Sequence, residues 1–252
     1  MPEKSGLKNC KSKGISIVNS IQLIKMDKVI GILGGMGPEA AADLCLKIIK
    51  NTPAKKDQDH LRVILDNNPK IPDPVKATLG EGEDPTLYLI ETAKNLERAG
   101  ADFIIIACNT AHYYLERIRS EINIPIINGI KEVGLLVKKI KLKKVGLLAS
   151  SGTLKSGIYQ KEFKPLGIEI IEPSKAGQKL VMKAIYGIKA GHKEKDLLLK
   201  VGKELIQKGS QALIEGCTEI PLVLRKGDFP VPLIESTETW AKVCISKAKE
   251  ST

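Results

Sequence analysis

The sequence feature that most constrains the fold is a strand-like segment that ends in a cysteine and occurs twice. Residues 104–107 are Ile-Ile-Ile-Ala and lead directly to Cys108, and residues 212–216 are Ala-Leu-Ile-Glu-Gly and lead directly to Cys217. Short apolar runs of this kind are typical of buried strands in parallel sheets. A hydroxyl-bearing residue and an expected helix start follow each cysteine. The chain is therefore predicted to consist of two similar halves, each contributing one cysteine.

The flanking residues repeat in the same way. Gly100 and Gly209 stand the same distance before the two cysteines, each where a glycine would close a predicted helix. A short edge-like strand that opens at a proline follows each cysteine, at residues 124–127 and 231–234. These matches support an internal duplication.

Strands and helices alternate along the rest of the chain, which predicts an α/β fold of two doubly wound parallel-sheet domains related by pseudo-two-fold symmetry. We expect residues 66–74 to form a loop because turn-forming residues dominate them. The other expected strands are 29–33, 61–65 and 145–149. One expected helix begins at residue 38, and the others cover 85–99, 131–139, 154–163, 178–188, 195–208 and 236–249.

The predicted domain boundaries follow from this pattern. Residues 1–25 are an N-terminal extension that we expect to be disordered, and Met26 is a candidate for the true start. Residues 26–128 together with 233–252 form the first expected domain, which carries Cys108, and residues 129–232 form the second, which carries Cys217. Ligands of such sheets bind at the carboxyl ends of the strands. Both cysteines are therefore expected to face one cleft between the domains.

Composition narrows the functional classes. The formal net charge of +11 fits a nucleic-acid surface, the lysine-rich exterior of a thermophilic protein, or attraction of small anions. No basic block interleaved with aromatic residues is present, so we expect no nucleic-acid partner. No apolar run is long enough to span a membrane, and residues 1–25 have no small-residue cleavage site that would mark a signal peptide.

The cysteine and histidine counts point to the compartment and argue against a metal. Five cysteines without paired spacing favour a reducing compartment, and we expect the protein to be cytoplasmic. His60, His112 and His192 have no metal-ligand spacing, so no metal site is predicted.

Two cysteines on opposite walls of a cleft suit the inversion of a carbon acid. At a strand end and a helix start, a thiol can be held partly as thiolate. One thiolate would remove a proton from one face of the carbon, and the other thiol would return a proton to the opposite face. A redox pair is disfavoured because Cys-x-x-Cys is absent. A loose dinucleotide fingerprint at Gly35, Gly37 and Ala40 with Asp66 leaves the cysteines unexplained.

Polar residues beside the cysteines suggest how a substrate could be held. Asn109, Thr110 and Thr218 offer donors for an amino-acid carboxylate, although helix capping is an equal alternative for each residue. Glu219, next to Thr218, could orient an ammonium group, polarise the Cys217 thiol, or favour a helix start.

Several of these segments together resemble the cofactor-independent aspartate/glutamate racemase family, and the closest resemblance is to aspartate racemase. The likeness runs from about residue 28 to the C-terminus. The resemblance implies an isomerase that is a cytoplasmic homodimer of two similar α/β domains, acts on a small amino-acid substrate, and uses no pyridoxal phosphate and no metal. The segments are residues 31–38, 66–69 with 71–73, 82–85, 107–112 and 216–221.

The resemblance also assigns roles to individual residues. Cys108 and Cys217 would be the acid/base pair, and Lys189 matches a lysine near the distal carboxylate in archaeal-type aspartate racemases. The residues expected to line the substrate are Met36, Asn109, Thr110, Ala111 and Thr218, with Glu219 beside them.

One position departs from the family. Many aspartate racemases have Ile-Pro-Asp-Arg where this chain has Ile71-Pro72-Asp73-Pro74, and a proline cannot form a bidentate carboxylate clamp. Lys76 or Arg62 could substitute, or the substrate could be an amino acid other than aspartate.

The predicted function is thus interconversion of L- and D-aspartate or glutamate by a two-base thiolate/thiol mechanism. Related thiol enzymes, such as hydantoin racemase and maleate isomerase, are the nearest alternative, and an arylmalonate decarboxylase is disfavoured because it would need only one cysteine. A non-catalytic two-domain protein that binds a small acid is the other alternative.

Overall fold

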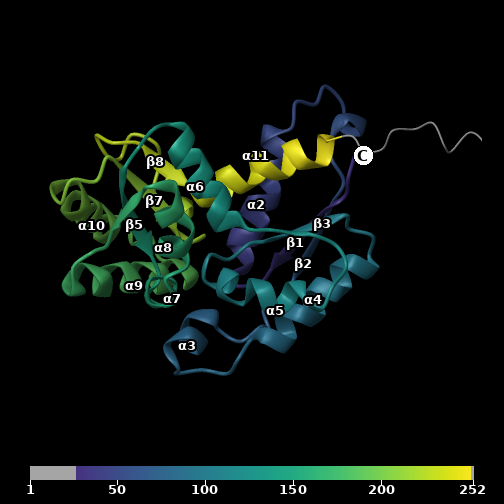
Figure 1. Cartoon of the computed structure of the whole chain (residues 1–252), viewed down its shortest axis with the longest axis horizontal. Coiled ribbons are helices and arrows are strands. Elements are labelled where there is room, and N and C mark those ends of the chain that lie inside the picture. Colours follow the sequence, from purple (N-terminus) through teal and green to yellow (C-terminus); the bar gives the residue numbers. More distant parts are fainter. Residues whose placement is uncertain (1–26, 251–252) are drawn as a thin grey trace, which may run out of the picture.

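Two four-stranded parallel sheets, each flanked by helices, make up the fold (Figure 1). The computed structural model describes residues 27–250, so the predictions for residues 1–25 and for Met26 lie outside the described range. The first sheet has the order β2-β1-β3-β4 and the second β6-β5-β7-β8, and every strand pair is parallel. The two orders are the same once the strands of each half are numbered from its start. The predicted α/β class and the duplicated architecture are therefore confirmed.

In the first half, the elements are β1 (Ile30–Gly34), α2 (Pro38–Asn51), η2 (Asp57–Asp59), β2 (Val63–Asn67), α3 (Pro74–Leu79), α4 (Thr86–Arg98), β3 (Phe103–Ile106), η3 (Thr110–Tyr114), α5 (Leu115–Arg119) and β4 (Ile126–Ile127). In the second half, they are α6 (Gly129–Lys139), β5 (Lys144–Ala149), α7 (Ser151–Ser156), α8 (Ile158–Phe163), η4 (Lys164–Leu166), β6 (Glu169–Ile171), α9 (Lys175–Lys189), α10 (Lys195–Gln207), β7 (Ala212–Gly216), η5 (Ile220–Leu222), β8 (Leu233–Glu235) and α11 (Ser236–Lys249).

The turn between β1 and α2 shows how local sequence shapes the site. Gly35 has φ of 104°, and a Cβ atom there would lie 2.1 Å from the carbonyl oxygen of Asn68. Only glycine fits this combination of backbone angle and close approach. Pro38 then begins α2 at a position that tolerates its missing N–H. The chain therefore leaves β1 sharply and keeps its carboxyl end open.

The predicted loop at residues 66–74 is wrong at both ends. Asp66 and Asn67 belong to β2, because they pair in register with Leu33 and Gly34 of β1 and sheet pairing outweighs their turn propensity. At the other end Pro74 begins α3, with the Asp73 carboxylate accepting a capping hydrogen bond from the Val75 N–H at 2.8 Å. Asp73 and Pro74 are thus fixed by a helix start.

Other boundaries also differ from the predictions. The expected helix at 154–163 is two helices, α7 and α8, because Gly157 between them has φ of 64°. The expected helix starts after the cysteines are short 3₁₀ turns, η3 and η5. The remaining strands and helices differ by a few residues at their ends, and α5 and β6 were not predicted.

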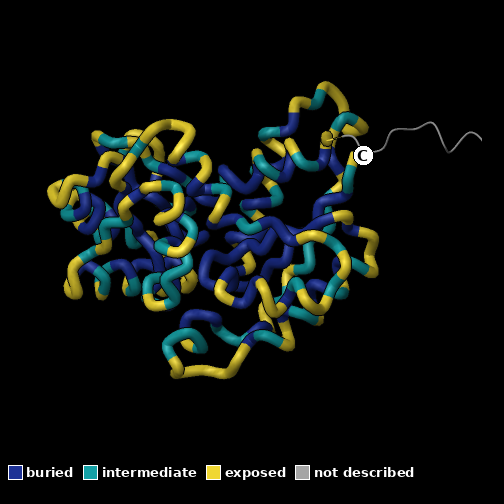
Figure 2. Tube along the Cα trace, viewed as in Figure 1, coloured by how far each residue is buried: buried dark blue, intermediate teal, exposed yellow. Residues whose placement is uncertain are grey.

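Three apolar clusters stabilise the two sheets, and one of them is shared by both. This shared cluster joins residues from β1, β3, β5 and β7 to α2, α6, α8 and α11. The outer faces of the two sheets are covered separately, the first by α4 and α5 and the second by α9 and α10. In Figure 2 the buried trace runs through the strands and the region between the halves, whereas exposed segments lie on the periphery.

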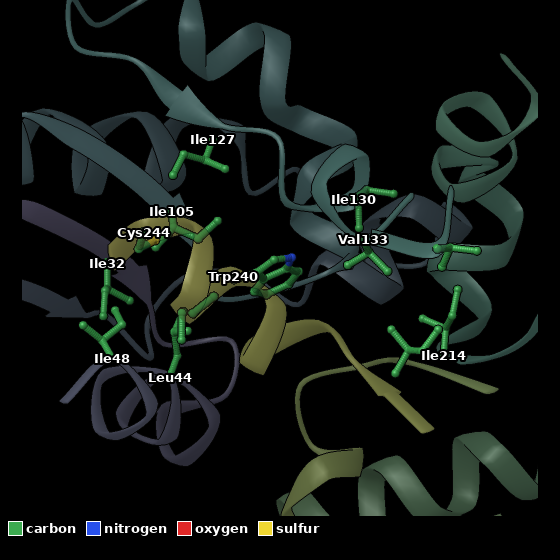
Figure 3. Packing of buried hydrophobic residues seen from close by; sticks show 14 of the residues in the cluster. Ile32, Leu44, Ile48, Ile105, Ile127, Ile130, Val133, Ile214, Trp240 and Cys244 are labelled. Atoms are coloured by element: carbon green, nitrogen blue, oxygen red, sulfur yellow. The ribbon is translucent and has the colours of Figure 1, made fainter. Parts of the chain in front are cut away.

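Helix α11 links the two halves through the shared cluster. It packs on α2 and α6, and Figure 3 shows its Trp240 between Ile105 and Leu44 on one side and Ile130 and Val133 on the other. Trp240 is fully buried, and its indole N–H donates to the carbonyl of Gly129 at 2.8 Å. The boundaries at residues 128 and 232 stay a prediction, because this core extends across both halves.

Candidate active site

A pocket lies at the carboxyl ends of the strands, between the two halves. Cys108 follows β3 and Cys217 follows β7, and both thiols line this pocket although the residues are only 7% and 9% exposed. The pocket is narrow, with a cavity volume of about 20 Å³. Its lining residues are Met36, Asp73, Pro74, Val75, Cys108, Asn109, Thr110, Ile185, Tyr186, Lys189, Cys217, Thr218 and Glu219.

Most of the residues predicted from the sequence meet in this pocket. Cys108 and Cys217 lie there together with Met36, Asn109, Thr110, Lys189, Thr218 and Glu219. Ala111 is fully buried and does not line the pocket, but its backbone N–H points to the Cys108 thiol. Its contribution to the site is therefore through the backbone only.

Charged groups surround the Cys217 thiol. The thiol donates a hydrogen bond to Glu219 Oε2 at 3.0 Å, and the Thr218 hydroxyl also donates to Oε2, at 3.3 Å. The other carboxylate oxygen, Oε1, lies 3.3 Å from the Lys189 ammonium. The ammonium in turn donates to the Met36 carbonyl of the first half at 3.2 Å. Of the three alternatives for Glu219, the geometry favours polarisation of the thiol.

The expected thiolate character is not present in the resting site. Burial raises the pKa of Cys108 to about 11, and Lys189 offsets only part of that increase. Burial and then the Glu219 carboxylate raise the pKa of Cys217 well above its ordinary value. The 3₁₀ turns that follow the cysteines are too short to supply the strong helix dipole assumed from the sequence. Both thiols are therefore protonated at neutral pH in this state.

Lys189 is the charge that can reach both thiols. Burial opposes its charged form, but Glu219 and then the two cysteines raise the pKa of Lys189 overall, so it stays an ammonium. It lowers the pKa of both thiols. A cation placed this way stabilises a thiolate on either wall of the pocket.

His112 supports the loop that carries Cys108. Its Nδ1 donates to the carbonyl of Cys108 at 2.8 Å, and its Nε2 accepts from the Gly129 N–H at 3.1 Å. This pairing requires a neutral ring, and burial lowers the pKa of His112 to about 4. His112 is therefore a structural support of the site that carries no charge at neutral pH.

Hydroxyl groups join the two halves beside the pocket. The Thr110 hydroxyl lies 2.9 Å from that of Ser150 and 2.8 Å from that of Thr153, and these two hydroxyls are 3.0 Å apart. The side chain of Asn109 stands at the start of η3 but makes no capping hydrogen bond. Capping, the alternative considered for Asn109, is therefore not its role.

Helices α3 and α9 contribute further lining residues, from Pro74 and Val75 and from Ile185, Tyr186 and Lys189. The Tyr186 hydroxyl donates to Asp73 Oδ2 at 3.2 Å, which closes α3 against α9 over the pocket. Pro74 lies between them in the lining. Neither suggested substitute for an arginine at this position reaches the pocket: Arg62 precedes β2 at its amino end, and Lys76 is exposed. Lys189 is the one cation among the lining residues.

Sequence reasoning missed Tyr186 and Ile185, and gave Asp73 no role in the site. Tyr186 stands three residues before Lys189 on α9, so the helical period places the two side chains on one face. That spacing was a usable signal once Lys189 had been singled out. The approach of Asp73 depends on how α3 packs against the second half, which no local pattern indicates.

Within residues 27–250, no helix has the length and apolar content needed to cross a membrane. The same part of the chain contains no group of three or more His, Cys, Asp and Glu residues arranged to hold a metal ion.

The family model that matches this chain describes racemases, and two of its sequence relatives are racemases. The model of the Asp/Glu/Hydantoin racemase family matches residues 33–244. A broad-specificity amino-acid racemase of Bacillus subtilis (strain 168) is 30% identical over 227 residues, which cover 86% of this chain and 97% of the relative. A glutamate racemase of Aquifex pyrophilus is 35% identical over 160 residues, 60% of each chain.

Solved structures agree with the sequence relatives. An aspartate racemase of Picrophilus torridus superposes with a TM-score of 0.80 at 33% identity, covering 89% of this chain and 96% of that one. An aspartate racemase homologue of Pyrococcus horikoshii OT3 gives a TM-score of 0.73 at 29% identity, covering 89% and 100%. The family match extends over both cysteine motifs and both sheets. The chain therefore belongs to the Asp/Glu/Hydantoin racemase family and is an isomerase of the racemase type.

Proposed function

We propose that this protein interconverts the enantiomers of aspartate or glutamate without a cofactor, using Cys108 and Cys217 as the acid/base pair. The observation that carries the proposal is that both thiols line one pocket from opposite halves of the chain. In each turnover, one thiolate takes the α-proton and leaves the electron pair on the α-carbon. The other thiol then gives its proton to the opposite face and becomes the thiolate.

The charges of the pocket explain how a buried thiol can start this cycle. Glu219 accepts the hydrogen bond of Cys217 and is placed to take its proton, which leaves a Cys217 thiolate near the Lys189 ammonium. No net charge is created in the pocket by this transfer. The developing carbanion and its carboxylate would be met by the Asn109 amide, by nearby backbone N–H groups and, once Glu219 is protonated and no longer accepts from it, by the Thr218 hydroxyl.

The acidic substrate class is supported by Lys189. It is the one cation that lines the pocket, and it lies on α9 across from the loop between β1 and α2. A substrate side-chain carboxylate would find its partner there, in competition with Glu219. Glutamate and aspartate differ by one methylene, so the pocket charge alone does not select between them.

A second candidate is racemisation of amino acids with uncharged side chains. Pro74, Val75 and Ile185 give the pocket an apolar wall at the position where the family resemblance places an arginine. The Bacillus subtilis relative, described as a broad-specificity amino-acid racemase, adds support for this wider range. The two candidates share the thiol chemistry and differ in the side chain that the pocket accepts.

We further propose a cytoplasmic homodimer that binds a small-molecule substrate and no nucleic acid. The support is the family likeness, together with cysteines that are all free among the described residues. The domain division at residues 128 and 232 is proposed on the same basis, with the pocket between the two units.

The test is proton NMR of the purified protein with L-aspartate, L-glutamate and L-alanine in separate deuterated samples, under reducing conditions with no cofactor added. We expect the α-proton signal to disappear and the D enantiomer to form, as measured on a chiral column. Cys108→Ala and Cys217→Ala should each abolish formation of the D enantiomer.

Cys45→Ser provides a matched control, because Cys45 is a half-buried thiol on α2 outside the pocket. It should racemise like the wild type. A wild type that exchanges no α-proton in a wider set of amino acids, or a cysteine variant with full activity, would refute the proposal. Turnover of alanine but of neither acid would favour the second candidate.

A further inference from the structure

The Asn109 side chain, next to Cys108, is held by a buried network from the second half. Its Oδ1 accepts from the Tyr159 hydroxyl at 2.7 Å, and its Nδ2 donates to Ser236 Oγ at 3.3 Å. Asn109 is 2% exposed, and Tyr159 and Ser236 are fully buried. These two residues belong to α8 and α11, and neither lines the pocket.

The network fixes which way the Asn109 amide faces. Ser236 Oγ donates its single hydrogen to the carbonyl of Glu215 at 2.8 Å, so it can only accept from Asn109. The atom facing Ser236 must therefore be the amide nitrogen. If the amide were flipped, Oδ1 would face an oxygen that has no hydrogen to give, and the buried Tyr159 hydroxyl would lose its acceptor.

The same network connects the loops that carry the two cysteines. Asn109 adjoins Cys108, and the Glu215 carbonyl is two residues before Cys217 on β7. Tyr159 also lies close to the second thiol, since burial and then the Cys217 charge raise the pKa of Tyr159. A displacement of Asn109 relative to Ser236 would therefore change the position of one thiol relative to the other.

We propose that Tyr159 and Ser236 are positioning residues that hold the Asn109 amide with its second N–H directed to the substrate and keep the two cysteine loops in register across the pocket. The inference rests on the proposed function, since it assigns these residues a role in two-sided proton transfer. Neither residue touches the substrate. Their effect passes through Asn109 and the Glu215 carbonyl.

Two rates measured in deuterated buffer distinguish a positioning role from an effect on protein stability alone. The first is formation of the opposite enantiomer, which needs both thiols. The second is deuterium entry into the recovered starting enantiomer, which needs only the first thiol to remove the proton and return a deuteron from solvent. In a variant that is only less stable, both rates fall in the same proportion. In a variant whose thiols are misplaced, the rate of inversion falls more than the rate of deuterium exchange.

The variants are Tyr159→Phe and Ser236→Ala, each of which deletes one hydroxyl. Ser210→Ala is the matched control, because Ser210 is a buried serine whose hydroxyl has no hydrogen-bond partner in the described residues. We expect inversion to fall by about tenfold or more in either test variant, with a higher ratio of exchange to inversion. The control should keep the wild-type ratio, and thermal melting of each variant reports whether it is folded.

The two possible failures are distinct. If the wild type inverts an amino acid but both variants keep its ratio of exchange to inversion, or lower it, the positioning role is refuted and the racemase proposal stands. If the wild type inverts no amino acid, the racemase proposal fails and the inference fails with it. Should one variant not fold, the other decides, because their hydroxyls act on opposite ends of the same amide.

Discussion

Replacing Glu219 by glutamine should make Cys217 the more reactive thiol of the pocket. Glu219 is 3% exposed, and its Oε2 accepts the Cys217 S–H at 3.0 Å, so a full negative charge stands beside a thiolate that forms there by losing its proton to solvent rather than to Glu219. Glutamine has the same shape and removes that charge. It also leaves the Lys189 ammonium without the carboxylate that lies 3.3 Å away, so the cation is free to stabilise the thiolate.

The size of the effect follows from Coulomb's law. Two unit charges at the 3.0 Å separation of Sγ and Oε2 repel by about 5.5 kcal/mol at an effective dielectric constant of about 20. At twice that dielectric constant the repulsion is about 2.8 kcal/mol, and removing it gives about a hundredfold more thiolate. The pKa of Cys217 falls, and each thiolate is then about tenfold less nucleophilic. Alkylation of Cys217 should therefore accelerate by about tenfold.

The assay measures the rate constant of alkylation by iodoacetamide at fixed pH values between 6 and 10, peptide by peptide with mass spectrometry. Cys45 serves as the internal reference, because burial alone raises its pKa and it lies on α2 away from Glu219. Its profile should be the same in both proteins. The pKa of Cys108 should also fall, by less, because Glu219 is a smaller cause of its increase.

An unchanged or lower alkylation rate constant for Cys217 in Glu219→Gln would refute the reasoning. It would show that the carboxylate does not control this thiol through its charge. A shift confined to Cys108 would also contradict the geometry, since of the two cysteines it is Cys217 that donates to Glu219.

Three further outcomes are expected. Pro74→Arg should raise kcat/KM for aspartate relative to alanine by about tenfold, because a guanidinium at the start of α3 can bind a carboxylate; equal changes for both substrates in a steady-state assay would contradict this. Lys189→Met should slow the alkylation of Cys108 and Cys217 at a fixed pH, since Lys189 lowers the pKa of both thiols, and unchanged rate constants would contradict that role. The pKa of His112 is lowered from 6.5 to about 4, so its contribution to the unfolding free energy is complete above pH 6.5 and is lost as the pH falls towards 4. The difference in unfolding free energy between wild type and His112→Gln, measured by denaturant titration, should therefore shrink by about 3 kcal/mol from pH 7 to pH 4. A difference that does not change with pH would show that His112 is not held neutral.

Much of the fold could be predicted because its strands are short apolar runs flanked by glycine and proline. The two cysteine strands, the glycine turn after β1 and the final helix were located from these signals alone. The errors fell where tertiary contacts outweigh local preference. Pairing with β1 keeps Asp66 and Asn67 extended, and Gly157 divides a helical pattern that looks continuous in sequence.

The candidate site was predictable to the extent that the duplication reveals it. Cys108 and Cys217 stand out because they occupy equivalent positions, and the polar residues beside them follow directly. Tyr186 and Asp73 were not identified, because they meet through the packing of α3 and α9 from different halves. Tyr159 and Ser236 gave no signal, since a buried tyrosine or serine looks like any other core or helix-start residue.

The protonation state of the thiols is where sequence and structure diverge most. A strand end followed by a helix suggests a lowered thiol pKa, but the turns are short and both cysteines are buried, so desolvation dominates and raises the pKa. Burial depends on everything that packs around the residue and cannot be read from its neighbours in sequence.

By itself, the sequence determined the α/β class, the duplication and the two cysteines, because periodicity and turn chemistry are local properties of the chain. The tertiary structure decided which groups meet the cysteines: Glu219 and Lys189 at one thiol, His112 below the other, and the Asn109 network between them. Some of these contacts join residues as far apart as Asn109 and Ser236, and others set a charged group against a buried thiol. Both depend on how the two sheets pack against each other, and distance along the chain carries no information about that packing.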